Sequence, residues 1–177
     1  MLNRLHLTQR QRRIALKWTL YTVLFLLTMM VQTVCLGNVE FFGVHLHLLM
    51  ILVCCVCLRE SPESGGVYAL CMSLLWCLSG ADGGSLSIVV WTGLGVGLSL
   101  LCRTLINGRI LTCALCCLGA AWLEESILFL SKRLINHIPW SYYLTKALPC
   151  VLLSMILFPA FYGLVKCISR TGEIYGA

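Results

Sequence analysis

Charged residues are scarce in this chain: Asp, Glu, Lys and Arg make up only 11% of its 177 residues, against about 25% in an average soluble domain. Apolar residues make up 59%. A chain with so little charge cannot cover a soluble core with a polar surface, and its composition suits a lipid bilayer. Its length allows one membrane domain and leaves no room beside it for a second soluble domain of ordinary size.

Familiar catalytic motifs are also missing. The chain contains no Walker loop, HExxH, GxSxG or HRD-type sequence, so we expect no enzyme activity and no cofactor. The stretch GLGVG at 93–97 lacks the third glycine of a dinucleotide-binding motif, and no strand is predicted before it. In a membrane helix, Gly93 and Gly97 instead form a GxxxG motif, which lets two helices pack with their backbones close together. The second helix belongs either to this chain or to a partner.

Cysteine is abundant, with twelve residues, but nearly all lie in apolar runs such as CCVC at 54–57 and CALCC at 113–117. There they act as small apolar side chains. The CxxC in the second run has no further cysteine pair or histidine at ligand spacing. His45 and His47 form an HxH, but residues two apart on a helix point to different faces. We therefore expect neither a disulfide framework nor a metal site.

Apolar runs predict an all-α bundle of about six transmembrane helices, since about 20 residues cross a hydrocarbon core. The runs are 15–36, 44–58, 66–78, 86–105, 110–130 and 146–168. The second and third are short and joined by RESPES, so they are tilted, half-buried or a re-entrant pair, and five spans are the alternative. Pro149 and Pro159 can each kink the last span.

The domain organisation follows from these runs. We expect residues 1–177 to form a single membrane domain, with a basic cytoplasmic segment at 1–14, the bundle at 15–168 and a cytoplasmic tail at 169–177. The first run is too long for the apolar region of a signal peptide, and no small-residue cleavage site follows it. We therefore expect it to remain as the first span.

Basic residues flank the apolar runs and form no patch for nucleic acid, so they act as topology signals. With the amino terminus in the cytoplasm, ten of the thirteen lie on the inner side: Arg4, Arg10, Arg12, Arg13, Lys17, Arg59, Arg103, Arg109, Lys166 and Arg170. The outer side has Lys132, Arg133 and Lys146. This excess predicts that both termini are cytoplasmic. Glu60 and Glu63, in a cytoplasmic turn, are expected to be freely solvated.

Three acidic residues are candidates for function. Asp82 lies in SGADGGS between the third and fourth runs, and we expect a turn residue on the outer face. Glu124 and Glu125 lie about fifteen residues into the fifth run, where an isolated carboxylate costs several kcal/mol. We favour a span that ends near Leu123, or acids at headgroup level. The alternatives are a polar contact with a neighbouring helix and a proton- or ligand-linked role.

The segment SLLWCLSGADGGSLSIVVWTGLGVGLSLLCRTL, residues 73–105, resembles the central motif of the rod shape-determining MreD family. That family shows a small residue before Leu-Leu-Trp-Asp-Leu, then a Ser-Gly turn, a further glycine and an apolar span. The matching residues are Leu74, Leu75, Trp76, Leu78, Ser79, Gly80 and Gly84. The aspartate of the motif falls at Cys77, and Asp82 is out of register with it. The Pro-Asp often found at the start of the second span is replaced around residues 45–48.

The resemblance implies a multi-pass protein of the bacterial inner (cytoplasmic) membrane, whose fold is similar to the substrate-binding subunits of energy-coupling-factor transporters. It implies a non-enzymatic scaffold of the cell-elongation machinery, which sets rod shape through peptidoglycan synthesis. The implied partners are membrane lipid and an MreC-like protein, and through it an MreB-like filament and a RodA-type glycosyltransferase with its transpeptidase. No nucleic acid is expected among them.

The main alternative is a small-molecule-binding subunit of an energy-coupling-factor vitamin transporter. Such a subunit needs polar groups that converge on an outward-facing pocket. The candidates are Asp82, Glu124, Glu125 and the Tyr142–Tyr143 segment. A further alternative is a membrane protein or intramembrane enzyme of another class.

Overall fold

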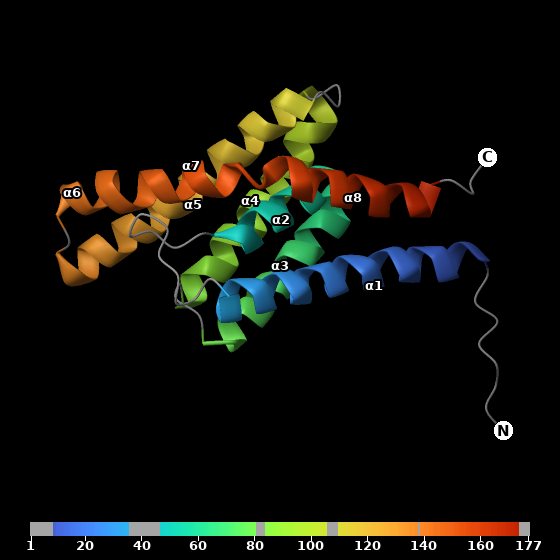
Figure 1. Ribbon diagram of the computed structural model, residues 1–177, viewed down its shortest axis with the longest axis horizontal. Helices are drawn as coiled ribbons and strands as arrows, with labels where there is room; N and C mark the ends of the chain where they lie inside the picture. Colours follow the sequence, from blue (N-terminus) through green and yellow to red (C-terminus); the bar gives the residue numbers. More distant parts are fainter. Residues whose placement is uncertain (1–8, 36–46, 81–83, 106–109, 138, 174–177) are drawn as a thin grey trace.

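The computed structural model describes residues 9–35, 47–80, 84–105, 110–137 and 139–173 as helices joined by turns, with no strand among them (Figure 1). The elements are α1 (Gln9–Met30), η1 (Val31–Cys35), α2 (Leu48–Cys57), α3 (Pro62–Leu78), α4 (Gly84–Leu105), α5 (Ile110–Asn136), α6 (Trp140–Tyr142), η2 (Tyr143–Ala147), α7 (Leu148–Met155) and α8 (Phe158–Glu173). The prediction of an all-α protein is confirmed for this part of the chain, and each predicted apolar run contains a helix.

Membrane-spanning length is reached by fewer helices than predicted. Three segments in the described ranges are long and apolar enough to cross a bilayer: Gln11–Val34, Gly84–Thr104 and Ile110–Ile135. Trp140–Met155 and Phe158–Arg170 are bent by 46° relative to each other and form a fourth crossing if the pair is one span. Six full spans are therefore not confirmed, because α2 and α3, with ten and seventeen residues, are shorter.

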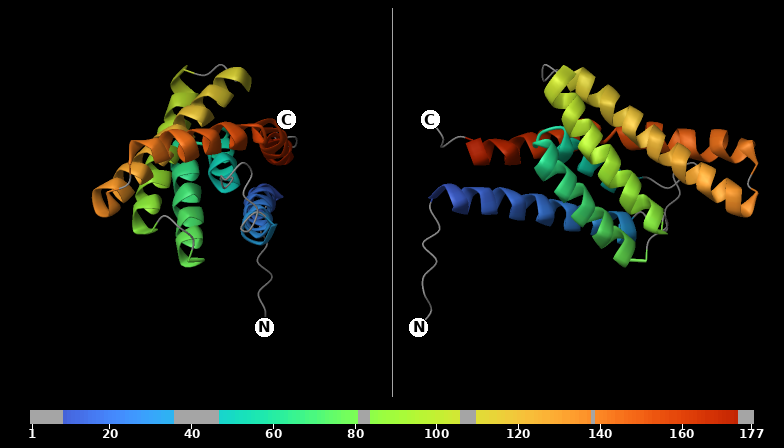
Figure 2. Two further views of the ribbon diagram at one scale, coloured as in Figure 1. Left: turned by 60° about the vertical axis from the view of Figure 1, so that its left-hand side comes forward. Right: turned by 180° about the vertical axis from the view of Figure 1, so that it is seen from behind.

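Helix α2 lies at the centre of the molecule, in contact with α1, α3, α4, α5, α7 and α8 (Figures 1 and 2). All ten of its residues are buried within the protein. A helix that is apolar on every side is buried either among other elements or in lipid. Ten helical residues extend about 15 Å, half of the roughly 30 Å of a hydrocarbon core. The second predicted span is therefore a core helix here.

Helices α3 and α4 pack closely against each other, and glycine makes this possible. A Cβ added to Gly95 would lie 2.7 Å from the Cβ of Ala69, and one added to Gly66 would lie 2.6 Å from Cγ2 of Val96. Carbon atoms do not approach so closely, because their optimal separation is about 3.5–4.0 Å. Small residues thus bring the two backbones together, as in other tightly packed membrane helices.

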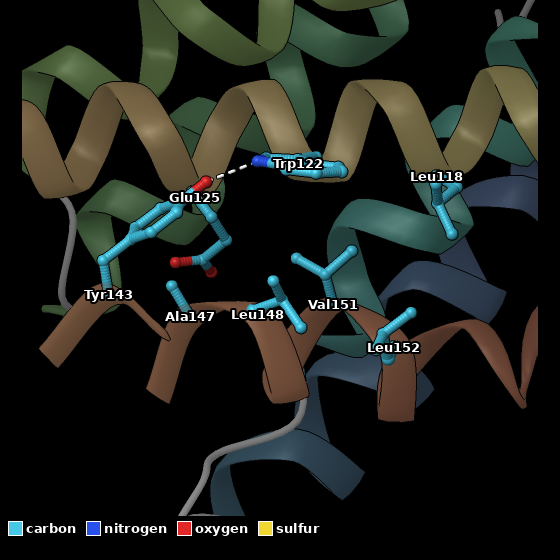
Figure 3. A pocket seen from close by; sticks show the side chains of 8 residues that line it. All are labelled: Leu118, Trp122, Glu125, Tyr143, Ala147, Leu148, Val151 and Leu152. Carbon is cyan, nitrogen blue, oxygen red and sulfur yellow. Dashed lines mark hydrogen bonds between the residues drawn. The ribbon is translucent and has the colours of Figure 1, made fainter. Parts of the chain in front are cut away.

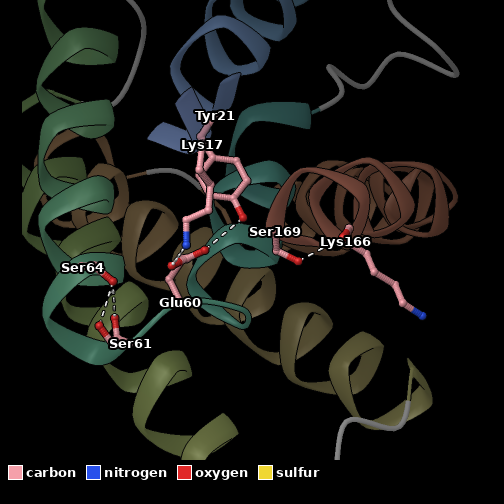
Figure 4. A network of polar contacts seen from close by, with 7 residues as sticks. All are labelled: Lys17, Tyr21, Glu60, Ser61, Ser64, Lys166 and Ser169. Atoms are coloured by element: carbon pink, nitrogen blue, oxygen red, sulfur yellow. Dashed lines mark hydrogen bonds and ion pairs between the residues drawn. The ribbon is translucent and has the colours of Figure 1, made fainter. Parts of the chain in front are cut away.

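The turn between α2 and α3 is bound to α1 by a polar network (Figure 4). Lys17 Nζ lies 2.8 Å from Glu60 Oε2, and the Tyr21 hydroxyl donates a 3.0 Å hydrogen bond to Glu60 Oε1. The Glu60 side chain is only 9% exposed. The expectation that Glu60 is freely solvated is therefore wrong, because packing of α1 encloses it, whereas Glu63 is exposed.

Candidate functional site

Two of the candidate acids lie in the middle of α5, and the third lies outside the described residues. Helix α5 continues without a break past Leu123 to Asn136, so the helix itself does not end near Leu123, and the position of the two acids at headgroup level stays a prediction. Glu124 and Glu125 consequently lie inside an apolar segment of spanning length. Asp82 and His45 belong to the parts of the chain that are not described.

Glu124 makes a polar contact with the neighbouring helix α4. Its side chain is buried, with 3% of the residue exposed, and its Oε1 accepts a hydrogen bond from the indole Nε1 of Trp91. A buried carboxylate needs such a donor, because burial without one costs several kcal/mol. Among the three interpretations of this residue, the geometry agrees with a structural polar contact.

Glu125 points the other way, toward α2 and α7. Its Oε1 lies 3.5 Å from Nε2 of His47, at the amino end of α2. This oxygen is buried and has no hydrogen-bond partner in the part of the chain that the structure describes. Cys150 of α7 is 5% exposed, and its Sγ, the imidazole nitrogen and a carboxylate oxygen all lie within 4.8 Å of one another. Three helices thus bring a nitrogen, an oxygen and a sulfur ligand together.

Hydrogen bonds hold the amino end of α2 in this position. The Ser154 hydroxyl oxygen accepts a 3.1 Å hydrogen bond from the backbone N–H of His47, and the Cys150 thiol interacts with both groups. Oε1 of Gln32 accepts a 3.1 Å hydrogen bond from the backbone N–H of Leu49. Because the first N–H groups of a helix have no partner inside it, α7 and η1 together cap α2.

A pocket of about 240 Å³ opens between α5 and the η2–α7 segment (Figure 3). Its lining residues are Leu118, Trp122, Glu125, Tyr143, Ala147, Leu148, Val151 and Leu152. The Tyr143 hydroxyl hydrogen-bonds to the Trp122 indole and to the Ser126 hydroxyl. Of the residues predicted for a ligand pocket, Glu125 and Tyr143 both line this one, from α5 and η2. The Glu124 carboxylate instead contacts α4.

The GxxxG residues of α4 lie on a face that the described chain leaves open. A Cβ added to Gly93 or Gly97 would meet no atom within 4 Å. The close contact with α3 is made instead by Gly95, on another face of the helix. Of the two alternatives for the second helix, one from the described part of this chain is thereby ruled out.

The cluster of His47, Glu125 and Cys150 has no signature in the sequence. The three residues are separated by 78 and 25 positions, and Cys150 lies in an apolar run that reads as helix core. The one local signal is the carboxylate at 125, since an acid in an apolar span needs a partner. The CxxC at 113–116 joins no comparable ligand cluster in the described ranges.

Comparison with known proteins identifies no relative: no family model, no curated protein and no solved structure matches the chain. The basis for a functional assignment is therefore the motif at 73–105 together with the geometry described above.

Proposed function

We propose that this chain is a non-enzymatic membrane scaffold of the bacterial cell-elongation machinery, and that it binds an MreC-like partner through helix α4. It lies in the inner membrane with both termini in the cytoplasm. The observation that carries the proposal is the open face at Gly93 and Gly97, where an added Cβ would touch nothing. The fold uses Gly66 and Gly95 for its own packing, whereas the GxxxG pair stays available to a second protein.

The open face has the shape that membrane helices use for association. Gly93 and Gly97 lie one turn apart and create a shallow groove, flanked along the same face by the exposed side chains of Val89 and Leu100. In lipid, helices associate through close van der Waals packing, because lipid tails are as apolar as leucine. A partner helix that fits the groove would gain contacts that lipid does not supply.

The MreD-like motif supports the proposal because it shapes the hairpin that presents this face. Ser79 closes α3, and Gly80 and Gly84 adopt φ angles of 76° and 59°. Only glycine takes up such left-handed conformations at no steric cost. The motif residues thus set the direction in which α4 leaves the turn. A scaffold built in this way biases its partner's assembly by binding one state of the partner more tightly than another.

The first test is capture of the tagged full-length protein from mildly solubilised membranes after brief crosslinking, with the co-purifying proteins identified by mass spectrometry. We expect an MreC-like protein together with wall-synthesis enzymes. Gly97→Leu should lower this capture about tenfold at an unchanged membrane level, a loss of about 1.4 kcal/mol, because the leucine fills the groove. Gly163→Leu is the matched control, since Gly163 of α8 is also exposed and open.

Two outcomes contradict the proposal. Equal capture by the wild type and by Gly97→Leu would remove the α4 face from it. Recovery of coupling ATPases without any wall-synthesis protein would instead assign the chain to a transporter.

The pocket between α5 and α7 favours a second candidate, a small-molecule-binding subunit of an energy-coupling-factor transporter. Glu125 and Tyr143 would supply its polar contacts. Its volume of about 240 Å³ is below the roughly 300–1,000 Å³ typical of ligand sites, and its walls are mostly apolar. For these reasons the scaffold is preferred, and the capture experiment distinguishes the two.

A further inference from the structure

We propose that His47, Glu125 and Cys150 form a Zn²⁺ site inside the helix bundle, where the amino end of α2 meets α5 and α7. The site is separate from the α4 face and does not depend on the scaffold function. It also departs from the expectation, drawn from sequence alone, that the chain has no metal site.

The spacing of the three ligand atoms suits a small tetrahedral ion. Zn²⁺ binds nitrogen and oxygen at about 2.0–2.2 Å and sulfur at about 2.3 Å, which places ligand atoms roughly 3.3–3.7 Å apart around it. The His47 Nε2 to Glu125 Oε1 distance is 3.5 Å, and Cys150 Sγ lies within 4.8 Å of both atoms.

The space between these side chains is the size of a single ion. It has a volume of about 10 Å³ and is bordered by His47, Glu125, Cys150 and Ser154, among others. A volume of about 10–15 Å³ is the least that admits one water molecule. The space is therefore too small for an organic ligand and large enough for a metal ion.

The balance of charge also favours a divalent cation. A thiolate and a carboxylate carry two negative charges, and the imidazole ligand is neutral, so Zn²⁺ makes the complex neutral overall. A neutral complex is what an apolar interior tolerates, since isolated buried charges are costly. A bound ion would also coordinate the buried Glu125 Oε1, which accepts no hydrogen bond from the residues that the structure describes.

The mixed donor set selects zinc over the common hard cations. Thiolate and imidazole ligands favour Zn²⁺, whereas Mg²⁺ and Ca²⁺ prefer oxygen ligands only. Three protein ligands leave a fourth tetrahedral position, which is the arrangement of zinc sites with exchangeable ligands. Glu125 also lines the larger pocket (Figure 3).

Ser154 is the positioning residue of this site. Its hydroxyl binds the His47 backbone and interacts with the Cys150 thiol, so it holds two of the three ligands in place. Loss of such an outer contact typically lowers metal affinity about 10–100-fold. Ser154→Ala should therefore weaken Zn²⁺ binding within this range without abolishing it.

The test is metal binding by the purified full-length protein in detergent. We expect one Zn²⁺ per chain, and substitution by Co²⁺ should produce a thiolate-to-metal charge-transfer band together with the visible bands of tetrahedral cobalt. Cys150→Ser should remove the charge-transfer band, and Glu125→Gln or His47→Ala should lower affinity by more than about tenfold. The matched controls are Cys71→Ser and Cys167→Ser, at exposed cysteines, and Glu63→Gln, at an exposed acid of α3. All three should bind as the wild type does.

The proposal is overturned if the wild type shows no thiolate–cobalt band, or if the band persists in Cys150→Ser. It is also overturned if Glu63→Gln lowers affinity as much as Glu125→Gln, because the loss would then not be specific to the proposed ligands. Each variant is first checked for monodispersity by gel filtration. Should Cys150→Ser fail to fold, Glu125→Gln, which preserves the shape of the side chain, decides the question. Partner capture is measured separately, so failure of the zinc site and failure of the scaffold are distinguishable.

Discussion

Gly93 and Gly95 lie two residues apart on α4, so they are on different faces of the helix and have different neighbours. An added Cβ at Gly95 would lie 2.7 Å from Ala69 Cβ and 3.1 Å from Cys57 Sγ, whereas at Gly93 it would meet nothing. Gly95→Ala should therefore lower stability by about 1–3 kcal/mol, the cost of overpacking a core. Gly93→Ala should leave it unchanged or raise it by up to about 1 kcal/mol, because alanine favours helix. Thermal unfolding in detergent measures both, and equal transition temperatures would contradict the close approach of α3 and α4.

The second prediction at the scale of single residues concerns the contribution of the Lys17–Glu60 ion pair to stability. Glu60→Gln should lower stability by about 1–3 kcal/mol, because it removes the charge from two hydrogen bonds in a partly buried site. The double-mutant cycle with Lys17→Met isolates the pair. Glu63→Gln, at an exposed acid in the next turn, is the control and should have no effect. If the stability losses of Glu60→Gln and Lys17→Met add up to that of the double variant within about 0.5 kcal/mol, the ion pair does not contribute to stability.

At the scale of elements, α2 depends on side chains of other helices for its amino-terminal cap. Gln32→Leu should lower stability by about 0.5–2 kcal/mol, because it leaves the Leu49 N–H buried without an acceptor. Thr33→Val is the control, since the Thr33 hydroxyl donates to the backbone carbonyls of Met29 and Met30 in the preceding turn. Chemical denaturation in detergent gives both values. Equal stability of the two variants would mean that η1 does not cap α2.

A proline separates the last two helices, α7 and α8. Helix α7 ends at Met155, and the chain turns by 46° before α8 begins at Phe158. Pro159 has no N–H to donate, and its ring would clash with the carbonyl four residues earlier, which is that of Met155. The predicted kink at Pro159 is thereby confirmed. The bend directs α8 along α1 while α7 remains against α5, where it contributes Cys150.

At the scale of the whole molecule, the start of α1 and the end of α8 lie on the same side (Figures 1 and 2). The turn after α2 faces the same region, because Glu60 binds Lys17 and the Arg59 guanidinium lies 5.4 Å from the Tyr162 ring. The proposed orientation puts this side in the cytoplasm. A green fluorescent protein fused to the carboxyl terminus should therefore fluoresce, and alkaline phosphatase fused after Ser79 should be active. The reverse pattern would contradict the proposed orientation.

The sequence by itself determined the helical class, the three long apolar helices and the bend at Pro159. These depend on composition, on the length of apolar runs and on residues such as Pro159, whose backbone constraints are local. Only the tertiary structure decided that α2 is a core helix, that Glu60 is enclosed, and that Glu124 and Glu125 face different partners. It alone joined Glu125 to His47 and Cys150. Such contacts depend on which faces of distant helices meet, and that is set by packing of the whole chain.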